Sequence, residues 1–244
     1  MASEKQELYD RLHIVRDTRI SAESGLPFSV VIPYAMYSPW YDDAKFMAAL
    51  GAIDGHSLID IYRAWELWSL VGQVAASGGD ILEVGVWRGG SGCLMAARAK
   101  QLGFATKVAL CDTFAGVAKA GSRDPSYKGG EHADTSPEIV QALAARMGAD
   151  NIELHRGIFP DDTAAGLAHR RFALVHIDVD VYESARQTFE WAWPRLLPGG
   201  AVVFDDYGFM KTGGITQIAN EVAKGPDRRM LHNLNGHAVI LKLA

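Results

Sequence analysis

The 244-residue sequence predicts an α/β fold built on a mostly parallel seven-stranded sheet with helices on both faces and an N-terminal helical lid. Three observations predict it. From Asp80 onward, short apolar runs alternate with helix-like stretches, the pattern of a largely parallel sheet covered by helices. A glycine-rich turn follows the first of these runs, and carboxylates follow two later ones. In open α/β sheets, ligands bind at the edge formed by the carboxyl ends of the strands, where these residues would lie.

Residues 1–77 are predicted as an N-terminal helical or lid segment, and residues 78–244 as the ligand-binding domain. The charged stretch 3–20 could be helical. The aromatic segment 34–46 could close over an acceptor, or pack against the domain or a second subunit. Residues 57–76 are predicted as one amphipathic helix, because Leu58, Ile61, Trp65 and Trp68 recur at helical spacing.

The remaining elements follow in alternation. The expected strands are 81–86, 108–111, 152–155, 172–177 and 201–204, with a final pair near 230–231 and 238–243. The expected helices are 91–102, one that begins near Ser136 with Pro137 in its first turn, 183–196 and 215–223. The connection 113–135 is too long to be a plain link, and long loops in compact domains are usually functional or disordered.

Composition excludes several classes of protein. Hydrophobic residues make up 48% of the chain and the net charge is −5, which fits a soluble globule and not a nucleic-acid binder that needs a basic surface. No apolar run reaches the roughly 18–20 residues of a membrane span, and residues 1–19 lack the apolar core of a secretory signal. Cys93 and Cys111 lie in apolar stretches and are expected to be buried thiols. We expect a cytoplasmic protein, assembled as a homo-oligomer, with no nucleic-acid or membrane partner.

The turn after the first strand has the spacing Glu83-x-Gly85-x-x-x-Gly89, not that of a dinucleotide fingerprint. Glycines there would let a ligand approach a helix start closely. An acid two residues before the first glycine suits a ligand with an ammonium or sulfonium group, and Asp112 ends the second strand, where an acid can bind both ribose hydroxyls. The alternative is a glycine turn that only lets helix and strand pack closely.

Carboxylates end two other predicted strands: Asp178 and Asp180 on one, Asp205 and Asp206 on the other. If these strands are neighbours, their ends lie about 5 Å apart. Such crowding needs raised pKa values or a bound cation, and all-oxygen ligands favour Mg²⁺. The histidines His176 and His155 are expected to alternate off this face, so zinc is not predicted. The alternative is that these acids cap turns or are solvated.

The Asp178-x-Asp180 pattern also occurs in haloacid-dehalogenase-like phosphatases and in metal-dependent glycosyltransferases. Only 64 residues follow Asp180, too few for the core that the phosphatase fold builds after its motif. The glycosyltransferase interpretation leaves the glycine turn unexplained. A third hypothesis is a non-catalytic module that binds an adenosine ligand or mediates oligomerisation.

Four motifs in order resemble the macrocin (TylF-like) O-methyltransferases, which act on antibiotic deoxysugars such as those of tylosin, mycinamicin and novobiocin. They are the segments beginning at Glu83, Asp112, Asp178 and Pro198, and the resemblance spans about residues 57–207. It implies a class I methyltransferase (Rossmann-like) fold, S-adenosylmethionine as methyl donor and a Mg²⁺ site. The acceptor would be a hydroxyl of a small molecule, a sugar or another natural-product intermediate.

The resemblance also implies roles for individual residues. Asp178, Asp205 and Asp206 would be the metal ligands, and Asp180 the general base, with His132 of the long loop as the alternative base. The cofactor-binding residues would be Glu83, Gly85, Val86, Trp87, Arg88, Gly89, Gly90, Ser91, Asp112, Thr113, Phe159 and Asp178. The sequence departs from the family pattern at Val179, where the family has glycine, in the segment 211–217 and before residue 57. The resemblance therefore supports the methyl donor and the metal site better than it supports the identity of the acceptor.

Overall fold

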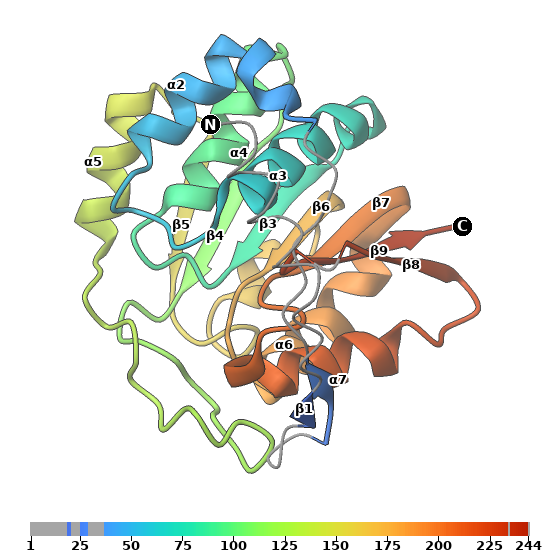
Figure 1. Ribbon diagram of the computed structural model, residues 1–244. Coiled ribbons are helices and arrows are strands. Elements are labelled where there is room, and N and C mark those ends of the chain that lie inside the picture. Colours follow the sequence, from blue (N-terminus) through green and yellow to red (C-terminus); the bar gives the residue numbers. More distant parts are fainter. Residues whose placement is uncertain (1–18, 21–24, 29–36, 234, 244) are drawn as a thin grey trace, which may run out of the picture.

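In the computed structural model, which describes residues 19–20, 25–28, 37–233 and 235–243, seven strands form one sheet in the order β5-β4-β3-β6-β7-β9-β8 (Figure 1). The first five in this order are parallel, whereas β9 runs antiparallel to both β7 and β8. The sheet is therefore mixed. Its strands are β3 (Asp80–Val84), β4 (Val108–Asp112), β5 (Ile152–Arg156), β6 (Phe172–Ile177), β7 (Leu196–Phe204), β8 (Arg228–His232) and β9 (Ala238–Lys242).

The central strands form because their sequences are almost continuously apolar. Every residue of β6 is buried, as are four of the five in both β3 and β4. Strands covered on both faces have this composition, which explains why the sequence located them well. β7 begins at Leu196, earlier than the predicted 201, because Leu196 already pairs with Phe172 before a register shift.

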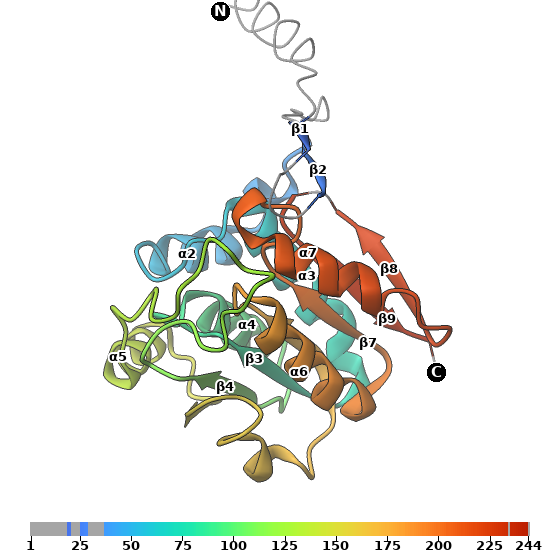
Figure 2. The same ribbon diagram turned by 90° about the horizontal axis from the view of Figure 1, so that it is seen from below.

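Helices cover both faces of the sheet (Figure 1). Those on one face are α2 (Ala44–Ala52), α3 (Ile61–Val74), α4 (Gly90–Gln101) and α5 (Pro137–Met147), and those on the other are α6 (Tyr182–Ala192) and α7 (Gly213–Val222). Figure 2 shows α6 and α7 lying across the sheet when it is seen from below. As predicted, Pro137 is in the first turn of α5, and the Ser136 side chain caps this helix by accepting the N–H of Ile139.

The predicted helix 57–76 is shorter in the structure. It begins at Ile61 because the Asp60 carboxylate accepts the N–H groups of Tyr62 and Arg63, which would otherwise lack partners at a helix start. The sequence did not predict α2, which Asp43 caps through the N–H groups of Lys45 and Phe46.

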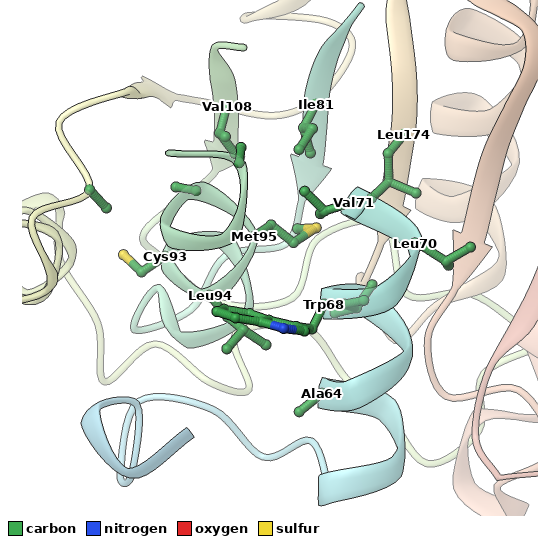
Figure 3. Close-up of a cluster of buried hydrophobic side chains, with 14 of the residues drawn as sticks. Ala64, Trp68, Leu70, Val71, Ile81, Cys93, Leu94, Met95, Val108 and Leu174 are labelled. Carbon is green, nitrogen blue, oxygen red and sulfur yellow. The ribbon is translucent and has the colours of Figure 1, made fainter. Parts of the chain in front are cut away.

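The described part of the predicted lid belongs to the core. Phe46, Leu67 and Trp68 are buried in the same hydrophobic cluster as Ile81 and Leu110 of the sheet (Figure 3 draws part of this cluster). Of the aromatic segment 34–46, residues 37–46 are described: Trp40 and Phe46 pack inward, whereas Tyr37 and Tyr41 are exposed. Closure over a ligand stays a prediction.

The N-terminal prediction is only partly covered by the structure. Residues 3–18 of the expected helix 3–20 lie outside the described residues, and Arg19–Ile20 form strand β1, paired with β2 (Pro27–Phe28). Within the described ranges, no helix combines the length and apolarity that crossing a bilayer requires. Cys93 and Cys111 are buried free thiols, as predicted, and burial raises the pKa of each to about 12.

Candidate functional site

A cavity of about 350 Å³ opens at the carboxyl edge of β3, β4, β6 and β7. Most of the predicted site residues line it: Gly85, Val86, Trp87, Ser91, Asp112, Thr113, His132, Phe159, Asp178, Asp180, Asp205 and Asp206. Glu83, Arg88, Gly89 and Gly90 do not line it. The fold thus brings the glycine turn and the two acidic strand ends together in one cavity.

Asp112 ties the glycine turn to the end of β4. Its Oδ2 accepts the N–H groups of Val86 and Trp87 at 2.6 and 2.9 Å, and its Oδ1 accepts the N–H of Phe114 at 2.6 Å. The carboxylate also faces the cavity. Each carboxylate oxygen has two lone pairs, so these contacts leave one lone pair on Oδ1 for a ligand hydroxyl. Binding of ribose hydroxyls by Asp112 stays a prediction.

The glycines of the turn are required by protein contacts. Gly85 has a φ of +88°, and a Cβ there would lie 1.7 Å from the backbone oxygen of Asp178. A Cβ at Gly89 would meet the Val140 side chain, and one at Gly90 the backbone oxygen of His56. Close packing, the alternative weighed for this turn, therefore explains these three glycines without a ligand.

Glu83 and Arg88 contact other parts of the protein and not the cavity. Glu83 is fully buried in β3, where its Oε1 lies 2.9 Å from His176 Nδ1 of the neighbouring strand. Its carboxylate points into the protein and does not reach the cavity wall. The expected direct contact between Glu83 and a cationic ligand is therefore not supported. Arg88 pairs with Asp134 at 2.7 Å and donates to the Gly55 carbonyl, which joins the turn to the long loop and to the segment before α3.

The carboxylates are as crowded as the sequence predicted. Removal from water raises the pKa of Asp178 well above its ordinary value, and the nearby Asp205, Asp206, Asp180 and Glu83 raise it further. Burial, followed by Asp205 and Asp180, raises the pKa of Asp206 to about 8. These shifts mean that negative charge at Asp178 and Asp206 lacks sufficient positive charge nearby. A cation with oxygen ligands fits this donor set.

The long loop 113–135 supplies part of the cavity wall. The Tyr127 hydroxyl donates to Asp180 Oδ1 at 2.8 Å, and burial, followed by the charge of Asp180, raises the pKa of Tyr127. Asp180 itself has a left-handed backbone, with φ +63°, just beyond the end of β6. His132 is exposed at the rim, with its ring 6.2 Å from that of Trp87. Sequence analysis identified Asp180 and His132 but missed Tyr127.

The family model of the macrocin O-methyltransferases (TylF) matches residues 51–223. The chain belongs to this family. The match confirms the resemblance drawn from the four motifs, and it disfavours the glycosyltransferase and phosphatase alternatives. The matched residues include α3, which carries Arg63 and lies before the four motifs.

Two relatives of this TylF-family chain are named as O-methyltransferases of a rhamnosyl-tetracenomycin and of mycinamicin III. An 8-demethyl-8-(2,3-dimethoxy-alpha-L-rhamnosyl)-tetracenomycin-C 4'-O-methyltransferase of Streptomyces olivaceus is 35% identical over 164 residues, which is 62% of each chain. Mycinamicin III 3''-O-methyltransferase of Micromonospora griseorubida is 32% identical over 168 residues, or 62% of this chain and 65% of the relative. The matches therefore span less than two thirds of these relatives.

Solved structures share the fold. The O-methyltransferase NovP has a TM-score of 0.70 at 20% identity, covering 85% of this chain and all of that one. The calicheamicin methyltransferase CalS11 has a TM-score of 0.65 at 19% identity, covering 85% and 94%. The class I methyltransferase architecture expected for a TylF-family chain is thus confirmed, with the mixed sheet described above.

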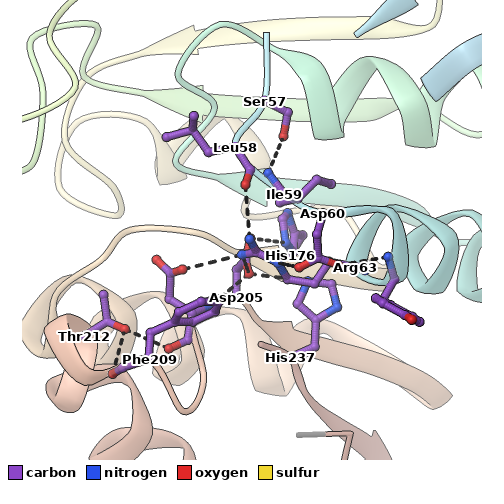
Figure 4. A network of polar contacts seen from close by, with 12 residues as sticks. Ser57, Leu58, Ile59, Asp60, Arg63, His176, Asp205, Phe209, Thr212 and His237 are labelled. Carbon is purple, nitrogen blue, oxygen red and sulfur yellow. Dashed lines mark hydrogen bonds and ion pairs between the residues drawn. The ribbon is translucent and has the colours of Figure 1, made fainter. Parts of the chain in front are cut away.

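Arg63 is a site residue that sequence analysis missed. It projects from α3, is almost fully buried, and places Nη1 2.5 Å from Asp205 Oδ1 and 3.5 Å from Asp206 Oδ1 (Figure 4). Burial alone would raise the pKa of Asp205, but His237, Arg63 and His176 together lower it. The available signal was one arginine on the apolar face of an amphipathic helix, which gives no indication of a partner 142 residues away.

The expectation that His176 lies off the carboxylate face is wrong. Residues two apart in a strand share a face, so His176 points to the same side as the continuation of β6 at Asp178. Its Nε2 lies 3.9 Å from Asp205 Oδ2. His155 is on β5, at the far edge of the sheet from β7. His237, just before β9, was not identified from the sequence, and its Nε2 lies 3.5 Å from Asp205 Oδ1.

Proposed function

We propose that this protein is a Mg²⁺-dependent O-methyltransferase that moves a methyl group from S-adenosylmethionine to a hydroxyl of a small-molecule acceptor, a sugar or another natural-product intermediate. One observation carries the proposal. A single cavity joins the Asp112-anchored glycine turn to the acidic ends of β6 and β7. The family match and the names of the relatives support the reaction type and the acceptor class.

The donor would lie against β3 and β4. Asp112 would accept a hydrogen bond from a ribose hydroxyl through Oδ1 while it holds the turn, and Thr113 and Ser91 would offer hydroxyls to the donor's polar groups. Phe159, which is buried at the cavity wall, would give an apolar surface. The cavity's acidic wall suits the positive sulfonium.

The carboxylates fit a Mg²⁺ ion. Asp178 and Asp206, whose pKa values are raised because their charge is uncompensated, would be ligands. Asp205 would join them through Oδ2, because its Oδ1 already accepts from Arg63 and from the Asp206 N–H. When bound, the ion would act as a Lewis acid that makes an acceptor hydroxyl easier to deprotonate.

Asp180 would take the proton from the acceptor hydroxyl. The acceptor oxygen then attacks the methyl carbon as the carbon–sulfur bond breaks, and no enzyme nucleophile is needed. Tyr127 donates to Oδ1 of Asp180, which would hold the carboxylate in place and leave its other oxygen for the acceptor hydroxyl. Alignment of donor and acceptor is the main contribution of the cavity, and it can supply about 7–11 kcal/mol of the barrier reduction.

Asp180→Asn tests the role of Asp180, since it keeps the shape and removes the basicity. With a panel of deoxysugar glycosides as acceptors, we expect kcat to fall about 10²–10⁴-fold, the usual effect of losing a general base. Affinity for S-adenosylhomocysteine should not change. His132→Gln is the matched comparison and should lose little. Near-wild-type turnover of Asp180→Asn, with a large loss in His132→Gln, would move the role of base to His132.

A further inference from the structure

Two buried histidines direct the same ring nitrogen toward one carboxylate. His176 on β6 and His237 before β9 are both fully buried, and neither Nε2 atom has a hydrogen-bond partner. They lie 3.9 and 3.5 Å from the two oxygens of Asp205, too far for hydrogen bonds of normal length (Figure 4). Asp205 lines the cavity and neither histidine does, so the two rings lie behind its wall.

A glutamate holds the other nitrogen of each ring. His176 Nδ1 lies 2.9 Å from Glu83 Oε1, and His237 Nδ1 lies 2.7 Å from Glu66 Oε2. A neutral imidazole that donates its Nδ1–H to a carboxylate keeps a lone pair on Nε2. A metal ion facing both Nε2 atoms and Asp205 would take the place of the ring protons through which the histidines lower the pKa of Asp205. Histidines that bind metals are oriented in this way, by a carboxylate on the nitrogen away from the ion.

We propose that His176, His237 and Asp205 bind a transition-metal dication of the Zn²⁺ type, at a second position that shares only Asp205 with the proposed Mg²⁺ ligands. The three ligand atoms lie within 4.8 Å of one another. A tetrahedral ion with bonds of about 2.0–2.1 Å separates its ligands by roughly 3.3 Å, so small side-chain rotations close the site. Imidazole nitrogens favour Zn²⁺, Co²⁺ or Ni²⁺ over Mg²⁺.

The local charge balance accommodates a dication. Glu66, Glu83 and Asp205 carry three negative charges, and Arg63 offsets one of them through Asp205. Asp60 and Asp206 also pair with Arg63, so at least two of these negative charges remain for the ion. Arg63 also donates to Asp60 and to the Leu58 carbonyl, so its position does not depend on Asp205 alone. The ion would join α3, β3, β6, β7 and β9 and orient Asp205 at the cavity floor.

Titration of the chelator-treated, full-length protein with Co²⁺ tests this site. We expect about one equivalent of Co²⁺ to give a visible d–d absorption band that excess Mg²⁺ leaves intact and Zn²⁺ abolishes. His176→Gln and His237→Gln should each reduce the affinity for Co²⁺ at least about 10-fold, the scale on which even supporting groups act. His155→Gln is the matched control, because its Nε2 is also buried without a partner but belongs to β5. It should bind Co²⁺ like the wild type.

Asp178→Asn separates this site from the proposed Mg²⁺ position and should keep the band. Absence of the band in the wild type would overturn the proposal, and so would its persistence in both histidine variants or its loss in Asp178→Asn. If a histidine variant does not fold, as judged by circular dichroism, X-ray absorption of the Zn²⁺-loaded wild type decides: imidazole ligands support the site, and oxygen ligands alone contradict it. Calorimetry with S-adenosylhomocysteine tests the proposed methyltransferase function independently.

Discussion

Replacing Arg63 with methionine tests how α3 is fastened to the acidic edge of the sheet. The side chains of Arg63 and Asp205 are 8% and 1% exposed, and methionine keeps much of the arginine stem while removing its charge. Breaking a buried ion pair on one side costs about 3–5 kcal/mol, since the remaining charge is left uncompensated. For a chain of this size each kcal/mol lowers Tm by about 2–4 °C, so we expect Tm to fall by roughly 6–20 °C.

Scanning calorimetry in EDTA measures this change without a contribution from bound metal. Arg186→Met is the control, because Arg186 pairs with Glu183 and Glu190 at the surface of α6. We expect it to cost less than about 1 kcal/mol. Arg63→Met combined with Asp205→Asn should recover part of the lost stability, because the neutral amide no longer needs a cation. A change below about 1 kcal/mol in Arg63→Met would refute the reasoning.

Three further substitutions test other contacts. Gly85→Ala should prevent folding or lower the free energy of unfolding by more than about 4 kcal/mol, because its Cβ would overlap the backbone oxygen of Asp178. The control is Gly103→Ala, which has a similar φ but open space around it and should lose only about 1–2 kcal/mol. Chemical denaturation measures both. Equal costs would rule out the overlap as the cause. Tyr127→Phe should lower kcat about 10–150-fold, the scale of a hydrogen bond to a charged group, with unchanged S-adenosylhomocysteine affinity. A kcat within two-fold of wild type would remove the hydroxyl from the mechanism. Asp112→Ala should weaken donor binding by about 1.5–3 kcal/mol, and an unchanged dissociation constant would exclude it from the donor site.

The sequence predicted the sheet and its acidic edge because both depend on local signals. Apolar runs located the buried strands, and the end of each strand set the position of Asp178 and Asp205. The parallel pairing of β6 with β7 then brings these acids together. The glycine turn lies where the sequence placed it, between β3 and α4, and Val140, the His56 backbone and Asp178 account for its glycines.

The contacts that the sequence did not predict join distant segments. Glu83 and His176 are 93 residues apart, Arg63 and Asp205 are 142 apart, and Glu66 and His237 are 171 apart. Glu83 and His176 meet because β3 pairs with β6, whereas the contacts of Arg63 and Glu66 form only when α3 packs on the sheet. No local periodicity in the sequence indicates either kind of contact. His176 is a different case, because local alternation does indicate its position. Residues i and i+2 of a strand share a face, so His176 lies on the face of Asp178 and not on the opposite one.

Isothermal titration calorimetry with S-adenosylhomocysteine tests the central claim, a methyl-donor site at the glycine turn beside a separate metal site, most directly. We predict about one equivalent bound per chain, with closely similar affinity in EDTA and in Mg²⁺, because the metal is assigned to the acceptor. Asp112→Ala should weaken this binding, and Asp206→Asn should leave it nearly unchanged. Absence of binding in both conditions would contradict the claim, and so would binding that requires Mg²⁺.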